Sequence, residues 1–201
     1  MSPRPRGRPP SPQTRQAIRE AAAELIAELG YDGTSVESIA VRAKAGKQTI
    51  YRLWGSKVGL VADLVRNGLL ALPAVPVADT GDLTADLLDW HVRFLPVAAD
   101  HATASIIRAL LVEQSSAPVT ASVDASRLLT PSLLSLRSRL DKAKERGEVR
   151  PDADLVAVEE LLVGAHALAF LHLAPLNLER VEAWLDALSR GLIPRSPPAA
   201  E

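Results

Sequence analysis

The chain contains no cysteine, which excludes disulfides, thiol catalysis and cysteine-ligated zinc, and which suits a reducing cytoplasm. It also lacks any apolar run that approaches the roughly 18 residues of a membrane span. Residues 1–15 have no apolar stretch of the kind that a secretion signal needs. Alternating β-branched runs are missing, and nothing repeats at a fixed period. We therefore expect an all-α, cytoplasmic protein without a membrane segment.

Motifs of enzymes and metalloproteins are also missing. There is no serine nucleophile motif, no phosphate-binding glycine loop and no dinucleotide fingerprint. The four histidines are His91, His101, His166 and His172, and they show neither an HExxH motif nor a closely paired spacing. His166 and His172 fall on different faces of a helix, so a shared metal would need a third ligand from elsewhere. We predict no enzymatic activity, no metal and no cofactor.

The net charge of −1 conceals an asymmetry along the chain. Residues 1–60 contain 10 Lys and Arg against 5 Asp and Glu, whereas the remaining residues contain 13 against 19. A basic first third joined to an acidic remainder is expected when only the first third meets nucleic acid, although chance clustering gives the same pattern.

Residues 34–57 have the pattern of two short helices joined by a tight turn. Thr34 and Glu37 form a predicted capping box that starts the first helix. The turn falls at 44–46, where Gly46 can adopt backbone angles closed to other residues. A second helix then runs from Lys47 to about Trp54, and apolar residues recur at helical spacing in both: Val36, Ile39, Ala40, Ala43, Ile50 and Leu53.

The second helix leaves a polar set of side chains outside: Lys47, Gln48, Thr49, Tyr51 and Arg52. Such a set over barely two turns suits a surface of phosphates and base edges. This is the pattern of a helix-turn-helix, whose second helix enters the major groove of DNA.

At these residues the sequence resembles the DNA-binding domain of the TetR family of bacterial regulators. The similarity covers roughly residues 11–70 and includes Ile39-Ala40, Ala43, the run from Lys47 to Arg52, Trp54 and Ser56-Lys57. The family usually has glycine where this chain has Lys44. Either Lys44 takes the turn conformation at some cost in strain, or Gly46 absorbs it.

The resemblance implies a role for each exposed group. Thr34, Tyr51 and Lys57 would mainly hold phosphates, and Gln48 and Arg52 would read bases; the remaining expected DNA contacts are Lys44, Lys47 and Thr49. Arg6 and Arg8, in a tail expected to be disordered over 1–10, lie in a Pro-Arg-Gly-Arg-Pro segment similar to an AT-hook, which inserts into the minor groove. A basic tail with only non-specific phosphate contacts is the alternative.

The rest of the chain is predicted to divide as follows. The helix-turn-helix domain covers 11–56, a connecting helix capped by Ser56 covers 57–72, a linker covers 73–82, and a helical domain covers 83–193 before a disordered tail at 194–201. The first helix starts at Ser11 and Pro12 and ends at Gly30. The helices expected in the last domain are 83–99, 101–115, 120–146, 153–173 and 178–191, with Pro131 able to split the third.

The last two helices carry more apolar surface than one chain needs. Residues 155–173 are apolar almost all round, and the next helix has a leucine-rich stripe with Trp184 beside it. In the TetR family such helices pair across a two-fold axis as a four-helix bundle. A homodimer is therefore expected, with a monomer as the alternative, through Leu162, Leu168, Val181, Trp184, Leu185 and Leu188.

A ligand pocket is expected between helices of the second domain, because such pockets are mostly apolar with a few polar groups. Its candidate residues are Trp90, His91, Phe94, Arg108, Leu111, His166 and Phe170.

Together these features favour a dimeric, ligand-responsive repressor that binds a palindromic operator in double-stranded DNA and is released by an unidentified small molecule. An activator of the same fold, a non-specific architectural DNA-binding protein and a helical protein with a vestigial DNA head are the alternatives.

Overall fold

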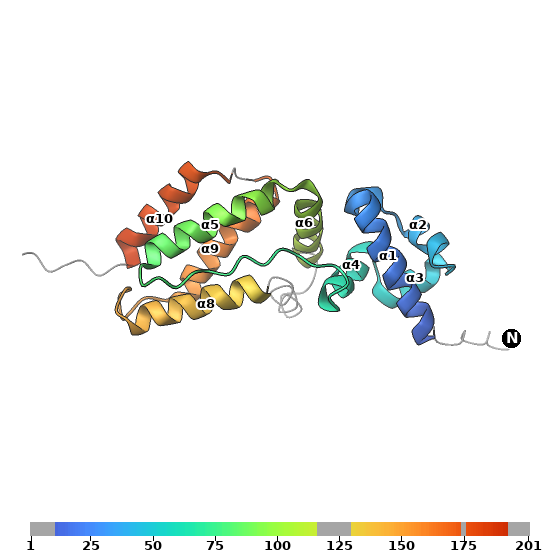
Figure 1. Ribbon diagram of the computed structural model, residues 1–201, viewed down its shortest axis with the longest axis horizontal. Coiled ribbons are helices and arrows are strands. Elements are labelled where there is room, and N and C mark those ends of the chain that lie inside the picture. Colours follow the sequence, from blue (N-terminus) through green and yellow to red (C-terminus); the bar gives the residue numbers. More distant parts are fainter. Residues whose placement is uncertain (1–10, 116–129, 174–175, 193–201) are drawn as a thin grey trace, which may run out of the picture. The chain divides into compact units, whose positions relative to one another are not determined.

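The computed structural model describes residues 11–115, 130–173 and 176–192, and every regular element in these ranges is an α-helix (Figure 1). In chain order the helices are α1 (Pro12–Gly33), α2 (Val36–Arg42), α3 (Lys47–Trp54), α4 (Lys57–Arg66), α5 (Leu83–Ala99), α6 (His101–Ser115), α8 (Thr130–Glu145), α9 (Leu155–Phe170) and α10 (Leu178–Leu192). The chain divides between Ala71 and Leu72 into two compact units. The prediction of an all-α fold is confirmed.

The first unit is built on α1. Ser11 caps this helix by accepting from the Thr14 amide, and Pro12 occupies its first turn. The inner face is apolar and buried, and consists of Ile18, Ala21, Ala22, Leu25 and Ile26. At Gly30 the backbone leaves helical angles (φ 73°, ψ 173°), so the regular helix ends where the sequence predicted, and one further turn follows.

The start of α2 corrects the predicted capping box. The cap is Ser35, whose hydroxyl accepts from the Ser38 amide while the Ser38 hydroxyl accepts from the Ser35 amide. Thr34 instead closes α1, because its hydroxyl donates to the Gly30 carbonyl at 2.8 Å. The prediction of Thr34 and Glu37 was wrong by one residue, because Ser35 and Ser38 satisfy each other's amides while the Thr34 hydroxyl is donated to the Gly30 carbonyl.

The turn between α2 and α3 is made by Lys44, which adopts φ 50° in the left-handed region. The Ala45 amide donates back to the Ala40 carbonyl and the Lys44 amide to that of Val41, which is the hydrogen-bond pattern of a Schellman motif. Gly46 is extended (φ −77°) and serves as the cap of α3. Of the two conformations that the sequence left open, the strained lysine is the one adopted.

The predicted connecting helix is shorter than expected, since α4 ends at Arg66 rather than near residue 72. The reason lies in Asn67 and Gly68. The Asn67 amide group donates to the Asp63 carbonyl, and Gly68 takes φ 69°, which lets Leu69 donate its amide to Leu64 in a second Schellman motif.

The predicted linker is not a free connection, because residues 72–82, here named the strap, pack on the second unit. Val75 is buried in the core, where its amide donates to the Ser132 hydroxyl and its carbonyl accepts from the Trp90 indole at 2.7 Å. The Val77 amide donates to Ser135. An extended segment has no internal backbone hydrogen bonds, so these side-chain partners on α5 and α8 satisfy it.

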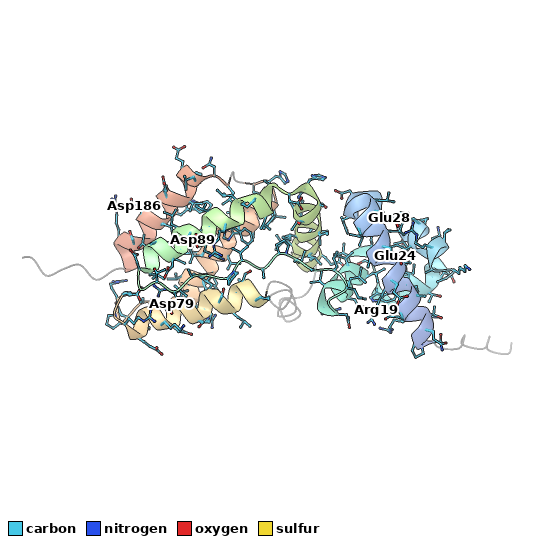
Figure 2. All side chains as sticks on the ribbon, in the orientation of Figure 1. Arg19, Glu24, Glu28, Asp79, Asp89 and Asp186 are labelled. Atoms are coloured by element: carbon cyan, nitrogen blue, oxygen red, sulfur yellow. The ribbon has the colours of Figure 1, made fainter. Side chains whose placement is uncertain are left out.

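A buried ion cluster fixes the strap to α5 and α8. The Arg139 guanidinium on α8, only 1% exposed, donates to Asp86 on α5 at 2.6 Å and to Glu148 at 2.6 Å. Asp79, labelled in Figure 2, pairs with Arg146 at 2.6 Å from the strap side. Burial alone would raise the pKa of Asp86, but hydrogen bonds from Thr80 and Arg139 outweigh it and leave the pKa below its usual value.

The remaining helices agree closely with the predicted ranges. α5 and α6 have the predicted bounds, whereas α9 begins and ends two or three residues inside its predicted range. α8 starts at Thr130 with Pro131 in its first turn, and the predicted helical residues 120–129 lie outside the described residues. Among the described residues no single helix has the length and hydropathy of a membrane span; α5 and the first part of α6 reach them only together, across a bend of 96°.

Replacing Lys44 with glycine is expected to stabilise the protein by about 1 kcal/mol, because a side chain in the left-handed region costs roughly 1–2 kcal/mol that glycine avoids, less its larger unfolded-state entropy. Urea unfolding of Lys44→Gly measures this. Lys44→Ala is the matched control, since it removes the same charge but keeps the Cβ. Equal stabilities for the two variants would contradict the strain.

Candidate functional site

The outer face of α3 is the exposed polar surface that the sequence predicted. Lys47, Gln48, Tyr51 and Arg52 are exposed, and Thr49 is half-buried. Ile50 on the opposite side is fully buried and holds the helix against the unit's core. Lys44 is exposed in the preceding turn, so these side chains form one surface of the first unit. The two tail arginines, Arg6 and Arg8, lie outside the described residues.

Lys47 has an acidic neighbour that the sequence analysis did not single out. Its ammonium donates to the Glu37 carboxylate on α2 at 2.8 Å, and this hydrogen bond raises the pKa of Lys47 and lowers that of Glu37. Both side chains are more than half exposed, so the pair is screened by solvent and worth little in stability. A phosphate can therefore replace Glu37 at small cost.

Two of the expected phosphate ligands are occupied inside the unit. Thr34 is 2% exposed and its hydroxyl is donated to a backbone carbonyl. The Lys57 ammonium donates to the Tyr31 and Thr34 carbonyls, each at 2.7 Å, and lies 3.8 Å from the centre of the Tyr31 ring. Burial lowers the pKa of Lys57. Lys57 thus binds two carbonyls at the end of α1, and neither side chain belongs to the exposed surface.

The position of α3 is set by a carboxylate on α4. Asp63 accepts from the Trp54 indole at 2.7 Å and from Arg19 of α1, labelled in Figure 2, at 2.7 Å. Burial alone would raise the pKa of Asp63, but these two hydrogen bonds outweigh it, so the pKa is lowered. Gly59 completes the corner, because a Cβ there would lie 2.2 Å from the Trp54 carbonyl oxygen. One charged group therefore joins α1, α3 and α4.

The second unit contains the predicted apolar cavity, with a volume of about 70 Å³. Five of the seven predicted residues line it: Trp90, Phe94, Leu111, His166 and Phe170. The sequence analysis missed the contribution of the strap and of the start of α8, which supply Leu72, Pro73, Ala74, Pro131, Ser132 and Leu133, together with Ile107, Val163 and Ala167. No periodicity could have shown this, because the strap has no regular structure.

The other two predicted pocket residues lie beside the cavity. His91 is fully buried behind it, with its Nδ1–H donated to the Leu87 carbonyl at 2.7 Å. Arg108 is half-buried and closes the end of α9, donating its Nε–H to the Phe170 carbonyl at 2.9 Å and contacting the ring of His172. Neither side chain lines the cavity, so the structure corrects their expected role as direct polar contacts.

A stacked pair of histidines stands next to the cavity. The rings of His91 and His166 lie 4.8 Å apart at 28°, and Trp90 meets both edge-on at 4.9 Å. Burial, and then the neighbouring His91, lowers the pKa of His166 to about 3, and burial lowers that of His91. Both rings are therefore neutral near pH 7. No group of three or more metal-ligating side chains occurs in the described residues.

The predicted dimer residues separate into two sets. Leu162, Val181 and Leu185 are between 0% and 5% exposed inside the second unit, so they belong to its own core and the structure corrects their expected place, although Leu162 also reaches the wall of a groove between α9 and α10. Leu168 is 46% exposed, and it lies with Trp184 and Leu188 on this groove. The groove residues that the sequence analysis missed are Glu160, Leu161, Gly164, Ala165, Ala167, Leu171, Arg180 and Ala187.

This division follows from the helical period of α9. Val158, Leu162, His166 and Phe170 recur every fourth residue and face inward. Leu161 and Leu168, with small residues between them, lie seven residues or two turns apart on another side of the helix. Because both sides carry leucines, hydropathy alone could not tell the two faces apart.

A short, exposed, polar helix held by a two-helix brace defines a helix-turn-helix DNA-binding protein, here joined to a separate helical unit with an apolar cavity. Residues 18–64 match the family model described as bacterial regulatory proteins, tetR family. Residues 77–188 match that described as tetracyclin repressor-like, C-terminal domain. The chain belongs to the TetR family. It is accordingly a DNA-binding transcriptional regulator and not an enzyme.

Individual relatives agree with this assignment. The chain is 31% identical over 159 residues to the uncharacterized HTH-type transcriptional regulator YdeS of Bacillus subtilis, covering 79% of each protein. It is 31% identical over 156 residues to the DNA-binding transcriptional repressor TetR of Mycobacteroides abscessus, covering 72% of this chain and 75% of that one. The crystal structure of the TetR family transcription regulator SCO0332 superposes with a TM-score of 0.60 at 26% identity, covering 90% of this chain and 100% of that one.

The histidine pair gives the protein a specific pH dependence. An unfolded histidine has a pKa near 6.5, so below this pH the unfolded chain binds protons that the folded chain, with His166 at about 3, does not. The free energy of unfolding should fall as pH drops from about 6.5 toward 3, by about 1.4 kcal/mol per pH unit for one histidine.

Urea unfolding between pH 7.5 and 5 measures this slope while the carboxylates stay ionised. His166→Phe should flatten the slope. Phe170→Leu loosens the same cluster but keeps both histidines. It should lower the free energy of unfolding at every pH without changing the slope against pH. An identical slope in His166→Phe and the wild type would show that folding does not lower the pKa of His166.

Proposed function

We propose that this protein is a ligand-responsive transcriptional repressor that binds a palindromic operator as a homodimer and is released by a small molecule. The observation that carries the proposal is the polar outer face of α3, fixed through Trp54 and Asp63 to α1 and α4. A helix of eight residues is unstable alone, so this bracing is what gives it one orientation for a DNA groove.

In this proposal α3 lies in the major groove. Gln48 and Arg52 read base edges, because amide and guanidinium groups pair in bidentate fashion with adenine and guanine. The exposed side chains of Lys44, Lys47 and Tyr51 hold phosphates, together with the half-buried Thr49. Thr34 and Lys57 contribute indirectly, because their hydrogen bonds fix the end of α1 against the start of α4. Two such heads would meet half-sites roughly 34–36 Å apart.

The groove on α9 and α10 supports dimerisation. Leu161 is 62% exposed and Leu168 is 46% exposed, and they flank Gly164 and Ala165. Small residues between larger ones let a second helix approach closely, and contiguous exposed apolar surface of this kind marks an interface. Dimerisation is typical of the family. We therefore place the partner subunit on this groove.

The cavity supports release by a small molecule. Its volume of about 70 Å³ is smaller than the roughly 150 Å³ that accommodates benzene, so an effector must expand it. Leu72, Pro73 and Ala74 form part of its wall, and they follow directly after the first unit in the chain. Expansion that moves these residues would act on the chain segment after α4 and change the separation of the two DNA heads.

Fluorescence anisotropy against DNA from upstream of the protein's own gene, with a scrambled control at two salt concentrations, tests the proposal. We expect tight, sequence-selective binding with two protomers per site. Equal and salt-sensitive binding to both DNAs would show that only electrostatic attraction contributes, and it would favour a non-specific architectural DNA-binding protein.

Lys47→Ala should weaken binding to all DNA sequences alike and reduce the slope of log K against log salt by about one, because one phosphate contact is lost. Titrations at four salt concentrations measure the slope. Arg150→Ala, which removes an exposed cation of the second unit, is the matched control and should leave it unchanged. An unaltered slope in Lys47→Ala would remove Lys47 from the phosphate contacts.

Leu168→Glu should convert the dimer to monomers, because it puts a charge in the centre of the α9–α10 groove. Light scattering after size-exclusion chromatography gives the mass of the particle. Leu134→Glu, at a leucine on α8 that is 63% exposed outside this groove, is the matched control and should remain dimeric. A dimeric Leu168→Glu protein would place the interface elsewhere.

A further inference from the structure

The cavity of the second unit has few polar groups, and almost all are already used. Among the described residues that line it, none is charged, and those with side chains able to form hydrogen bonds are Trp90, Ser132 and His166. The Trp90 indole donates to the Val75 carbonyl, and the Ser132 hydroxyl accepts from the Val75 amide. His166 is different, because its Nε2 has no hydrogen-bond partner among the described residues. The Nε2 of His91, stacked behind it, is unpaired as well, but His91 does not line the cavity.

An unpaired polar atom in such a place is costly. His166 is 5% exposed, and a buried donor or acceptor that forms no hydrogen bond has lost its hydration without compensation. Native structures retain few such groups, and those that persist call for an explanation. A ligand that completes the hydrogen bond on the imidazole would supply one, since His166 also forms part of the cavity wall.

We propose that this cavity selects uncharged, mainly apolar ring compounds that carry one hydroxyl group, with the neutral imidazole of His166 as the partner of that hydroxyl. This inference rests on the proposed function, because it names the chemical class of the effector. The imidazole presents one lone pair and one N–H, and a hydroxyl can serve either of them.

The surroundings exclude a charged ligand. A carboxylate or ammonium group would lose its hydration in a cavity whose described walls contain no counterion. Arg139, the buried cation of this unit, is already bound by Asp86 and Glu148. His166 cannot readily supply a positive charge either, because burial and the stacked ring of His91 oppose its protonation.

The walls also favour a flat molecule. The Phe94 ring lies 4.3 Å from that of His166 at 38°, and 5.8 Å from that of Phe170 at 75°. Trp90 meets His166 edge-on. Aromatic side chains set at such angles offer both faces and edges to a further ring, which gains from aromatic pairing in addition to its burial.

The test uses three probes of nearly equal shape, namely 4-methylphenol, toluene and 4-methylbenzoate. Isothermal titration of the full-length protein at pH 7.5 should show 4-methylphenol binding about tenfold more tightly than toluene, the equivalent of one hydrogen bond, with no binding of 4-methylbenzoate. Equal affinities for 4-methylphenol and toluene, binding of 4-methylbenzoate, or failure of all three probes to bind would each overturn the proposal.

The variant His166→Phe assigns the contact. It should keep its affinity for toluene and lose the tenfold preference for 4-methylphenol, whereas a preserved preference would overturn the role of His166. His101→Phe is the matched control: it removes an exposed histidine of α6 that does not line the cavity, and it should keep the preference. If His166→Phe does not fold, as judged by circular dichroism, the comparison of the three probes with the wild type still decides.

Release of DNA is measured separately, by anisotropy with and without 4-methylphenol. Binding of 4-methylphenol with the expected preference but without any loss of operator affinity would uphold the ligand class and contradict the proposed mode of regulation. Half-maximal loss of operator affinity at the same concentration of toluene and of 4-methylphenol would uphold the regulation and contradict the selection of a hydroxyl.

Discussion

The carboxylate of Asp63 is the interaction on which the DNA-binding unit depends. α3 has eight residues and one fully buried side chain, Ile50, which is too little to fix a helix by packing alone. Asp63 lies on α4, and its carboxylate accepts hydrogen bonds from the Trp54 indole at the end of α3 and from the Arg19 guanidinium on α1. Three helices thus contact one charged group, so a displacement of any of them would move the polar face of α3.

A second charge cluster joins several elements of the other unit. Arg139 joins α8 to α5 through Asp86, and Glu148 and Asp79 extend the cluster to the loop after α8 and to the strap. Removing one member of such a cluster leaves the others buried without a counter-charge, typically at a cost of about 3–5 kcal/mol. The strap is thereby part of the folded unit, although it contains no regular secondary structure.

Much of this architecture could be predicted from local signals. Pro12, Gly30 and Ser56 mark helix ends through capping chemistry that needs no tertiary context, and the bounds of α3, α5 and α6 followed from periodicity. The errors arose where neighbours compete. Ser35 displaced Thr34 as the cap because Ser38 completes a reciprocal pair of hydrogen bonds with it, and α4 ended early because Asn67 and Gly68 together form a stop.

The site was less accessible to sequence reasoning. Aromatic residues of the cavity could be chosen because they are large and few, yet Leu72, Pro73 and Ala74 reach it only through the path of the strap. In the same way Leu162 and Leu161 are indistinguishable by hydropathy, and only the packing of α9 shows that the first lies inside and the second outside.

The early end of α4 has a mechanical consequence. A helix continuous to residue 72 would behave as a stiff rod, able to transmit rotation as well as displacement. Residues 67–74 contain no helix, so the two units are joined by a tether whose far end is anchored at Val75. A tether can transmit a pull along the backbone but not a rotation. A movement of the cavity wall would therefore act by changing the length of free chain between α4 and Val75.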